Sequence, residues 1–283
     1  MENTNSIELK HRLAACRQTP LQHPDNFPFI VENYYFDNLE ITVVRDDLLC
    51  GGTKSRVLYP YLIDSGLAED YFDYVYVSPW YGGAQIALAW TCALLQQNLQ
   101  QHYQATLFYP APEGLEGVEV EPDDSRIPPY TRVALSYGAQ VFFVSPGTEY
   151  QAAQDYIKTH HAYLLPSGFN TPYVSNLITD LASNLIPYLG RFDECWSAVG
   201  SGTLIRSLEK SKIADKYYGV CVFQECHNIG LAQPIFPEIT FEETYPSSLW
   251  PPFSSALHYD AKVWPFLIFN STRERKILYW NVM

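Results

Sequence analysis

Short apolar runs alternate with longer helix-like stretches along most of the 283-residue chain, and this alternation restricts its fold more than any other feature. The short runs are rich in β-branched and aromatic residues, which is typical of buried strands. They fall at 41–44, 74–77, 106–109, 140–144, 162–165, 195–199 and 218–223. The helix-like stretches fall at 56–62, 84–97, 127–137, 149–158, 174–189 and 204–212. Such alternation predicts an α/β protein with largely parallel sheets.

Composition sets limits on the class of protein. Hydrophobic residues make up 47% of the chain and aromatic residues 15%, which is enough for a real core and excludes a disordered chain. The net charge of -13 argues against a broad electrostatic grip on nucleic acid backbones. No apolar run approaches the ~20 residues of a membrane span, and the first residues lack a secretion-signal pattern. We therefore expect a protein of the cytoplasm, or of the host cytoplasm if it is phage-encoded.

The six cysteines show no metal-binding spacing. They are Cys16, Cys50, Cys92, Cys195, Cys221 and Cys226, with no C-x-x-C pair and no paired Cys/His ligands among them. We expect no metal site. In a long chain without a secretion signal, cysteines are usually reduced and buried, so no structural disulfide is expected.

A glycine pair followed by a lysine is the most informative local segment. Gly51 and Gly52 follow an expected strand, and Lys54 stands at the expected start of a helix. The positive partial charge of a helix N-terminus disfavours the ammonium form of a nearby amine, so Lys54 is a candidate Schiff-base nucleophile. A solvated lysine after a turn is the alternative interpretation.

A second glycine turn follows the expected strand at 195–199. Its residues are Gly200, Ser201, Gly202 and Thr203, and a helix is expected to start there. Backbone amides and hydroxyls of such a turn can hold a phosphate, although similar turns also serve as tight packing corners. A reactive lysine and a site for a single phosphate are the two parts that pyridoxal phosphate requires.

Further short motifs occur in a fixed order along the chain. They are Thr19-Pro20-Leu21, Arg45-x-Asp47, Gly51-Gly52-Thr53-Lys54-Ser55-Arg56-x-Leu58, Pro166-Ser167-Gly168-Phe169-Asn170, Tyr259-Asp260-Ala261-Lys262 and Ile277-Leu278-Tyr279-Trp280. In this order the chain resembles the fold type II (tryptophan synthase β-like) pyridoxal-phosphate enzymes, especially 1-aminocyclopropane-1-carboxylate deaminase and D-cysteine desulfhydrase. The resemblance implies two open, largely parallel twisted sheets flanked by helices, with the cofactor in the cleft between two lobes.

The resemblance also implies roles for individual residues. Lys54 would bind pyridoxal 5'-phosphate as a Schiff base, and the turn of Gly200, Ser201, Gly202 and Thr203 would bind its phosphate. Asp260 takes the position of the deaminase's glutamate beside the pyridine nitrogen, where a carboxylate keeps that nitrogen protonated. Tyr259 takes the place of a tyrosine that acts next to the substrate; a core tyrosine is the alternative.

The segment 79–85 departs from the family pattern, because it lacks the asparagine that contacts the cofactor ring. We expect Tyr81 or Gln85 to substitute for it, with Gly168 and Asn170 as further substrate-binding residues. The phosphate turn has one glycine fewer than the commonest form, and the sequence ends where relatives continue through a Thr-Gly-Gly segment. The stretch 110–129, rich in Gly, Pro and acidic residues, is expected to be an exposed loop or lid.

These features predict two lobes and a class of reaction. Residues 1–55 plus 160–283 are expected to form a larger cofactor-binding lobe, and 56–159 a smaller mobile lobe.

The first hypothesis for the function is a lyase or deaminase acting at Cα or Cβ of a small amino acid, in a homodimer. A second is a phage-type enzyme, such as a decarboxylase, acting on an amino acid attached to thymine in DNA, with nucleic acid only as a modified-base substrate. A third is a non-catalytic binding relative.

Overall fold

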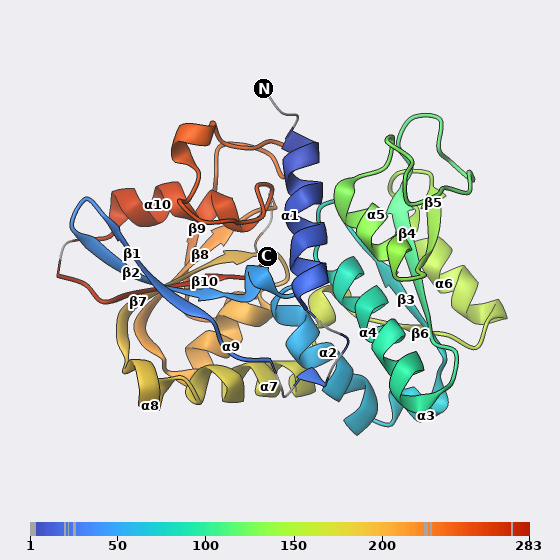
Figure 1. The fold of residues 1–283 in the computed structure, drawn as a ribbon, viewed down its shortest axis with the longest axis horizontal. Coiled ribbons are helices and arrows are strands. Elements are labelled where there is room, and N and C mark those ends of the chain that lie inside the picture. Colours follow the sequence, from blue (N-terminus) through green and yellow to red (C-terminus); the bar gives the residue numbers. More distant parts are fainter. Residues whose placement is uncertain are drawn as a thin grey trace. The chain divides into compact units, whose positions relative to one another are not determined.

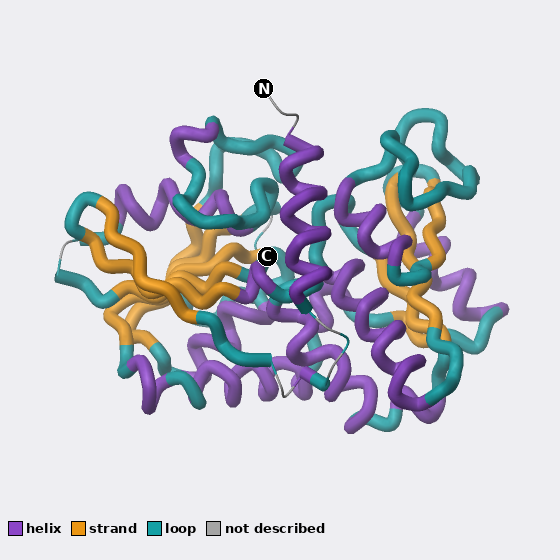
Figure 2. Tube along the Cα trace, viewed as in Figure 1, coloured by secondary structure: helices purple, strands orange, loops and turns teal. Residues whose placement is uncertain are grey.

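The computed structural model describes residues 4–19, 21, 23–24, 27–223, 226, 228–272 and 274–283. The chain forms two compact units, each with its own sheet (Figures 1 and 2). Unit 1 comprises Met1–Phe27 and Leu48–Phe169, and unit 2 comprises Pro28–Asp47 and Asn170–Met283.

Unit 2 contains a six-stranded sheet in the order β1-β2-β10-β7-β8-β9. The strands are β1 (Val31–Phe36), β2 (Leu39–Arg45), β7 (Phe192–Val199), β8 (Ala214–Cys221), β9 (Gln233–Ile235) and β10 (Ile277–Asn281). Only the β1–β2 pair among them is antiparallel. The helices are α7 (Pro172–Ser183), α8 (Ile186–Leu189), α9 (Thr203–Ser211) and α10 (Val263–Asn270), with short 3₁₀ turns η4 (Ser247–Leu249) and η5 (Asp260–Lys262). α7 and α9 lie on one side of the sheet and α10 on the other (Figure 1), which explains why every residue of β10 is buried.

Unit 1 contains a four-stranded parallel sheet in the order β5-β4-β3-β6. Its strands are β3 (Asp73–Val77), β4 (Gln104–Pro110), β5 (Gln140–Val144) and β6 (Tyr163–Leu164). Its helices are α1 (Thr4–Gln18), α2 (Thr53–Asp64), α3 (Leu67–Asp70), α4 (Ala84–Leu99), α5 (Pro129–Ser136) and α6 (Glu149–Thr159), with the 3₁₀ turn η3 (Ser167–Phe169); the turn η2 (Asp46–Leu48) lies at the boundary of the two units. α4 and α5 lie on one side of this sheet and α6 on the other (Figure 1).

These elements confirm the predicted α/β class with two largely parallel sheets flanked by helices. Each of the seven strands expected from the sequence is present, and all but one of the expected helices form as single elements. The exception is 174–189, where α7 ends at Ser183 and α8 begins at Ile186. Pro187 lies in the first turn of α8, where its missing N–H costs nothing, whereas it could not continue α7 without losing a hydrogen bond.

The unit boundaries differ from the lobes expected from the sequence. Residues 1–27, 48–55 and 160–169 group with the middle of the chain rather than with its C-terminal half. The reason is packing, because α1 contacts α5 and α2 contacts α4. Lys54 therefore belongs to unit 1.

The loop between β4 and α5 is mostly exposed, as expected, but it is anchored to the sheet. The N–H of Ala111 donates to the carbonyl of Val144 at 2.7 Å, and that of Gly117 to Phe143 at 3.0 Å. Leu115 is fully buried beneath it. In the described part of the chain no helix is both long and apolar enough to cross a bilayer.

Two disulfides correct the prediction that all the cysteines are reduced. Cys16 is bonded to Cys50, and Cys221 to Cys226, whereas Cys92 and Cys195 are free and buried. The first pair spans 34 residues and joins the last turn of α1 to the segment before α2. Sequence spacing did not reveal this pair, because only the packing of α1 brings its two cysteines together.

We expect two free thiols in the denatured, unreduced protein and six after reduction. Thiol titration in denaturant, with and without a reductant, measures this number. Six thiols before reduction would contradict the disulfide assignment.

Removing the two disulfides is expected to destabilise the protein unequally. A cross-link stabilises mainly by restricting the unfolded chain, more so for a longer loop. For separations of 34 and 5 residues this gives about 4 and about 2 kcal/mol. We therefore expect Cys16→Ser/Cys50→Ser to lose more unfolding free energy in urea than Cys221→Ser/Cys226→Ser. A larger loss in the second variant would contradict this explanation.

Candidate functional site

The turn that carries Lys54 requires both of its glycines. Gly51 and Gly52 have φ of 81° and 69°, a region that disfavours side chains other than glycine. A Cβ on Gly51 would lie 2.5 Å from the backbone of Ala87 in the first turn of α4. The turn therefore lies directly against α4, and it places Lys54 as the second residue of α2, where its side chain is half-buried.

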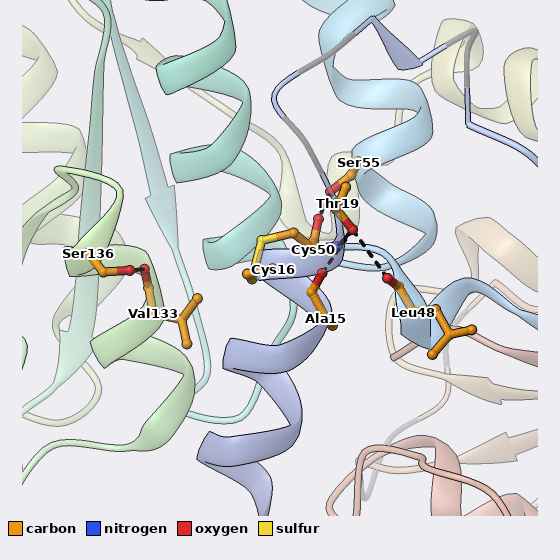
Figure 3. Close-up of a disulfide and its surroundings, with 8 residues drawn as sticks. All are labelled: Ala15, Cys16, Thr19, Leu48, Cys50, Ser55, Val133 and Ser136. Atoms are coloured by element: carbon orange, nitrogen blue, oxygen red, sulfur yellow. Dashed lines mark hydrogen bonds between the residues drawn. A yellow bond between two sulfur atoms is a disulfide. The ribbon is translucent and has the colours of Figure 1, made fainter.

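Thr19 and the Cys16–Cys50 disulfide anchor this turn to α1 (Figure 3). The Thr19 hydroxyl lies 3.0 Å from the carbonyl of Ala15 and 3.2 Å from that of Leu48, and it accepts the N–H of Cys50 at 3.0 Å. The Ser55 hydroxyl donates to the carbonyl of Cys50. Thr19 belongs to the Thr-Pro-Leu motif, of which Pro20 lies outside the described residues. The motif's threonine thus holds the segment just before Lys54.

Gln85 and Tyr81, both expected at the substrate, lie at the start of α4 in unit 1. The Gln85 amide donates to the carbonyls of Pro79 (3.2 Å) and Trp80 (3.0 Å), and its oxygen accepts the hydroxyl of Tyr109. Both amide hydrogens are therefore used to order the loop before α4. The half-buried Tyr81 ring contacts the Tyr130 ring edge-on, 6.2 Å between centroids. Since Gly51 contacts Ala87, the structure places the Lys54 turn and this loop at the same end of α4.

Gly168 and Asn170 lie on either side of Phe169 in the segment after β6. Gly168 has φ of 62°, and its N–H donates to the Tyr76 hydroxyl at 3.1 Å. The buried Phe169 packs against the Tyr76 ring at 5.1 Å. Asn170 begins the second segment of unit 2, where its side-chain oxygen accepts a hydrogen bond of 2.6 Å from Arg206.

The predicted phosphate turn joins β7 to α9. Gly202 has φ of 75° directly before Thr203, the first residue of α9. The hydroxyls of Ser201 and Thr203 lie 3.0 Å apart. A Cβ on Gly200 would lie 2.8 Å from the hydroxyl of Tyr259, so glycine is needed at this position for close approach. Unit 2 thus brings the predicted turn and the predicted Tyr259 together.

Asp260 follows Tyr259 and is completely buried. Its carboxylate accepts the backbone N–H of Met283 at 2.9 Å, and its carbonyl accepts the hydroxyl of Tyr279 at 2.7 Å. Burial, with the Asp260 charge as a further cause, raises the pKa of Tyr279 well above its usual value, so that hydroxyl remains a donor. These contacts hold η5, and with it the Tyr259–Asp260 pair, against the end of β10.

Three polar residues near the predicted site were not among the residues predicted to form it. Arg206 donates to the carbonyl of Ser201 at 3.3 Å. Lys262 is buried, donates to the carbonyls of Thr240 (2.6 Å) and Phe241 (3.2 Å), and has its pKa lowered by burial to about 8. His258, the residue before Tyr259, lies 3.3 Å from the Phe241 carbonyl through Nδ1. The sequence offered one signal for Arg206, which is its position three residues after Thr203 in the expected helix. His227, which has no partner at metal-ligand spacing in the sequence, lies outside the described residues.

Replacing Gly51 by alanine is expected to destabilise unit 1 strongly. The left-handed backbone costs an L-residue about 1–2 kcal/mol, and the contact with Ala87 adds the cost of moving backbone. Gly114→Ala is a matched control, because its φ is +75° but nothing lies within 4 Å of the added Cβ. Urea unfolding should show a loss of about 3 kcal/mol or more for Gly51→Ala and about 1 for Gly114→Ala. Equal losses would contradict the close packing of the turn on α4.

His258 is expected to make the protein less stable in acid. Burial lowers its pKa from 6.5 to about 4, with the Lys262 charge acting in the same direction and Glu242 opposing it. Between pH 6.5 and 4 the unfolded chain binds a proton that the folded chain does not, so stability falls as pH falls through this window. At ~1.4 kcal/mol per unit, the loss reaches about 3 kcal/mol.

The variant His258→Asn retains a donor near Nδ1 but takes up no proton. Its urea unfolding free energy should therefore decline less than that of the wild type between pH 6.5 and 4. Parallel declines of the two proteins would show that His258 is not responsible.

Comparison with solved structures identifies the fold. The chain is similar to a hydrogen sulfide-producing enzyme from Fusobacterium nucleatum, with 15% identity, 91% of this chain and 93% of that chain covered, and a TM-score of 0.62. It is similar to an ACC deaminase homologue, with 12% identity, 96% and 94% covered, and a TM-score of 0.65. It is also similar to threonine deaminase isoform 2 from Solanum lycopersicum, with 13% identity, 98% of this chain and 89% of that chain covered, and a TM-score of 0.64.

No protein-family model matches the chain, and no curated protein matches its sequence. The likeness in structure nevertheless extends over nearly the whole chain. It confirms the resemblance in fold: the chain has the architecture of the fold type II pyridoxal-phosphate enzymes.

Proposed function

We propose that the protein is a pyridoxal-phosphate-dependent enzyme of the lyase or deaminase type that acts on a small amino acid. The observation that carries the proposal is Lys54, which follows two left-handed glycines at the start of α2 in a chain with this fold. The structural neighbours support the class of reaction, since two are named as deaminases or their homologues and one as a hydrogen sulfide-producing enzyme.

The turn between β7 and α9 fits the phosphate of this cofactor. Gly200 and Gly202 are both required by close packing, because an added Cβ would lie 2.8 Å from the Tyr259 hydroxyl and 2.5 Å from the Asn228 carbonyl oxygen. The hydroxyls of Ser201 and Thr203 lie side by side at the start of α9. A helix N-terminus favours anions, since its first N–H groups have no partner within the helix. We assign the phosphate to this turn.

Lys54 would bind the cofactor covalently through Nζ and would later move a proton at the substrate's Cα. Its turn is held by the disulfide, by Thr19 and by contact with α4, so few backbone movements can displace it. A lysine without a rigid attachment would lose more conformational entropy on forming the bond. When bound, pyridoxal phosphate accepts the electrons released at Cα.

Asp260 would hold a proton at the ring nitrogen of the cofactor. The residue is buried, so its carboxylate acts in a medium where charge–charge interactions are strong. The Met283 N–H hydrogen-bonds this carboxylate at 2.9 Å and so fixes its orientation. A carboxylate in that position favours reactions in which the cofactor withdraws electrons strongly.

Tyr259 is the second candidate for moving protons. A Cβ on Gly200 would lie 2.8 Å from its hydroxyl, so that hydroxyl lies beside the turn assigned to the phosphate. The loop ordered by Gln85, with Tyr81, is the proposed wall toward the substrate. Deamination, β-elimination and decarboxylation are all compatible with these residues.

Absorbance of the purified protein with added pyridoxal phosphate tests the proposal. We expect a visible absorbance band from lysine-bound cofactor. Borohydride should reduce the bond between the lysine and the cofactor, and mass spectrometry should then find the added mass of the cofactor on the peptide that contains Lys54. Lys54→Ala should lose the band. Lys158→Ala, an exposed lysine paired with Asp155, is the matched control and should retain it.

Absence of a band at saturating cofactor would contradict the proposal and favour the non-catalytic alternative. If the band forms, its change on addition of free amino acids identifies the substrate class. A response only to aminoacylated thymine in DNA would favour the DNA-modifying alternative over a small amino acid.

A further inference from the structure

Arg206 lies in the first turn of α9, and its side chain hydrogen-bonds three segments of unit 2. Its Nη1 donates to the carbonyl of Ser201 at 3.3 Å and to the carbonyl of Asn228. Its Nη2 donates to the side-chain oxygen of Asn170 at 2.6 Å. One guanidinium therefore connects the turn assigned to the phosphate, the loop after β8 and the segment that enters α7.

All of these acceptors are neutral. Across the described residues no carboxylate lies within ion-pair distance of Arg206, whereas Arg126 and Arg191 each have one and Arg45 has two. Burial also lowers the pKa of Arg206 from its usual value, which shows that its charge is disfavoured where it lies. A cation near a helix N-terminus is further disfavoured by the helix dipole. Among the residues that the structure describes, the positive charge of Arg206 is therefore not paired with a carboxylate.

The contacts of Arg206 depend on glycine at position 202. A Cβ at this position would lie 2.5 Å from the Asn228 carbonyl oxygen and 2.8 Å from Nη1 of Arg206. Glycine is therefore needed both for its φ of 75° and for the approach of the guanidinium. The loop after β8 is also attached further along α9, because the Leu231 N–H donates to the Glu209 carboxylate at 2.8 Å.

We infer that Arg206 is a positioning residue for the phosphate monoester of the cofactor, which it favours through its charge and through the turn that it holds. This inference rests on the proposed function. The phosphate dianion would supply a negative charge beside the guanidinium, which the described residues contact only through neutral acceptors. Through Asn170 the same side chain also orders one of the residues expected at the substrate.

A comparison of pyridoxal phosphate with pyridoxal, which lacks the phosphate, tests this role. Charge-assisted interactions of this kind are worth about 10- to 100-fold in affinity. We expect Arg206→Met to bind pyridoxal phosphate about 10- to 100-fold more weakly in absorbance titrations, with little change for pyridoxal. Arg206→Lys should fall in between, because it retains the charge but loses the fork of donors. Arg191→Met, an exposed arginine paired with Asp215, is the control and should behave as wild type.

Thermal unfolding with inorganic phosphate gives a second readout that does not depend on Schiff-base formation. Phosphate should raise the Tm of the wild type and of Arg191→Met, but raise that of Arg206→Met less. Equal weakening of pyridoxal phosphate and pyridoxal, or no weakening of either, would overturn the inference. If the wild type binds neither compound, the proposed function fails. In that case the effect of inorganic phosphate on Tm decides the inference alone. A rise in Tm that occurs in the wild type and is lost in Arg206→Met supports an anion site. A rise that persists in Arg206→Met, or no rise in the wild type, overturns the inference.

Discussion

The pairing of β10 with both β2 and β7 is the interaction on which unit 2 depends. The pairing places Ile277 beside Ile41 on one side and beside Glu194 on the other. Three segments far apart in sequence therefore form the centre of one sheet. Closing such long loops costs entropy, which must be offset by burial. Tyr279 and Trp280, both fully buried, supply much of that burial, and the Trp280 indole donates to Asp46 at 3.0 Å.

Parallel pairing has a direct consequence for the candidate site residues. The carboxyl ends of β7, β8 and β10 meet at one edge of the sheet, because these strands run in the same direction. Gly200 follows β7, and Met283, which hydrogen-bonds Asp260, follows β10. Tyr259 reaches Gly200 from the segment held by that contact. The strand order thus gathers residues 200–203 and 259–260, which lie far apart in the sequence.

Features set by a few neighbouring residues could be predicted from the sequence. The strand at 140–144 and the glycine turns before Lys54 and Thr203 depend on local composition, and the structure has them where expected. The Cys16–Cys50 bond could not be predicted, because it requires α1 to pack beside the segment before α2. Gln85 or Tyr81 was expected to substitute for the asparagine that the segment 79–85 lacks. The use of both Gln85 amide hydrogens for the preceding loop depends on a backbone path that no spacing rule gives.

The acidic character of the chain and a phosphate site are physically compatible, because they act over different distances. The acidic residues behind the net charge of -13 are spread along the chain, and salt screens exposed charges beyond about 8 Å at physiological ionic strength. Arg206 and the first amides of α9 act within hydrogen-bond distance, where screening is weak. A duplex presents many phosphates to a broad surface, so the same net charge opposes it. A single phosphate monoester needs only one turn, and its binding is therefore decided by local geometry rather than by the charge of the whole protein.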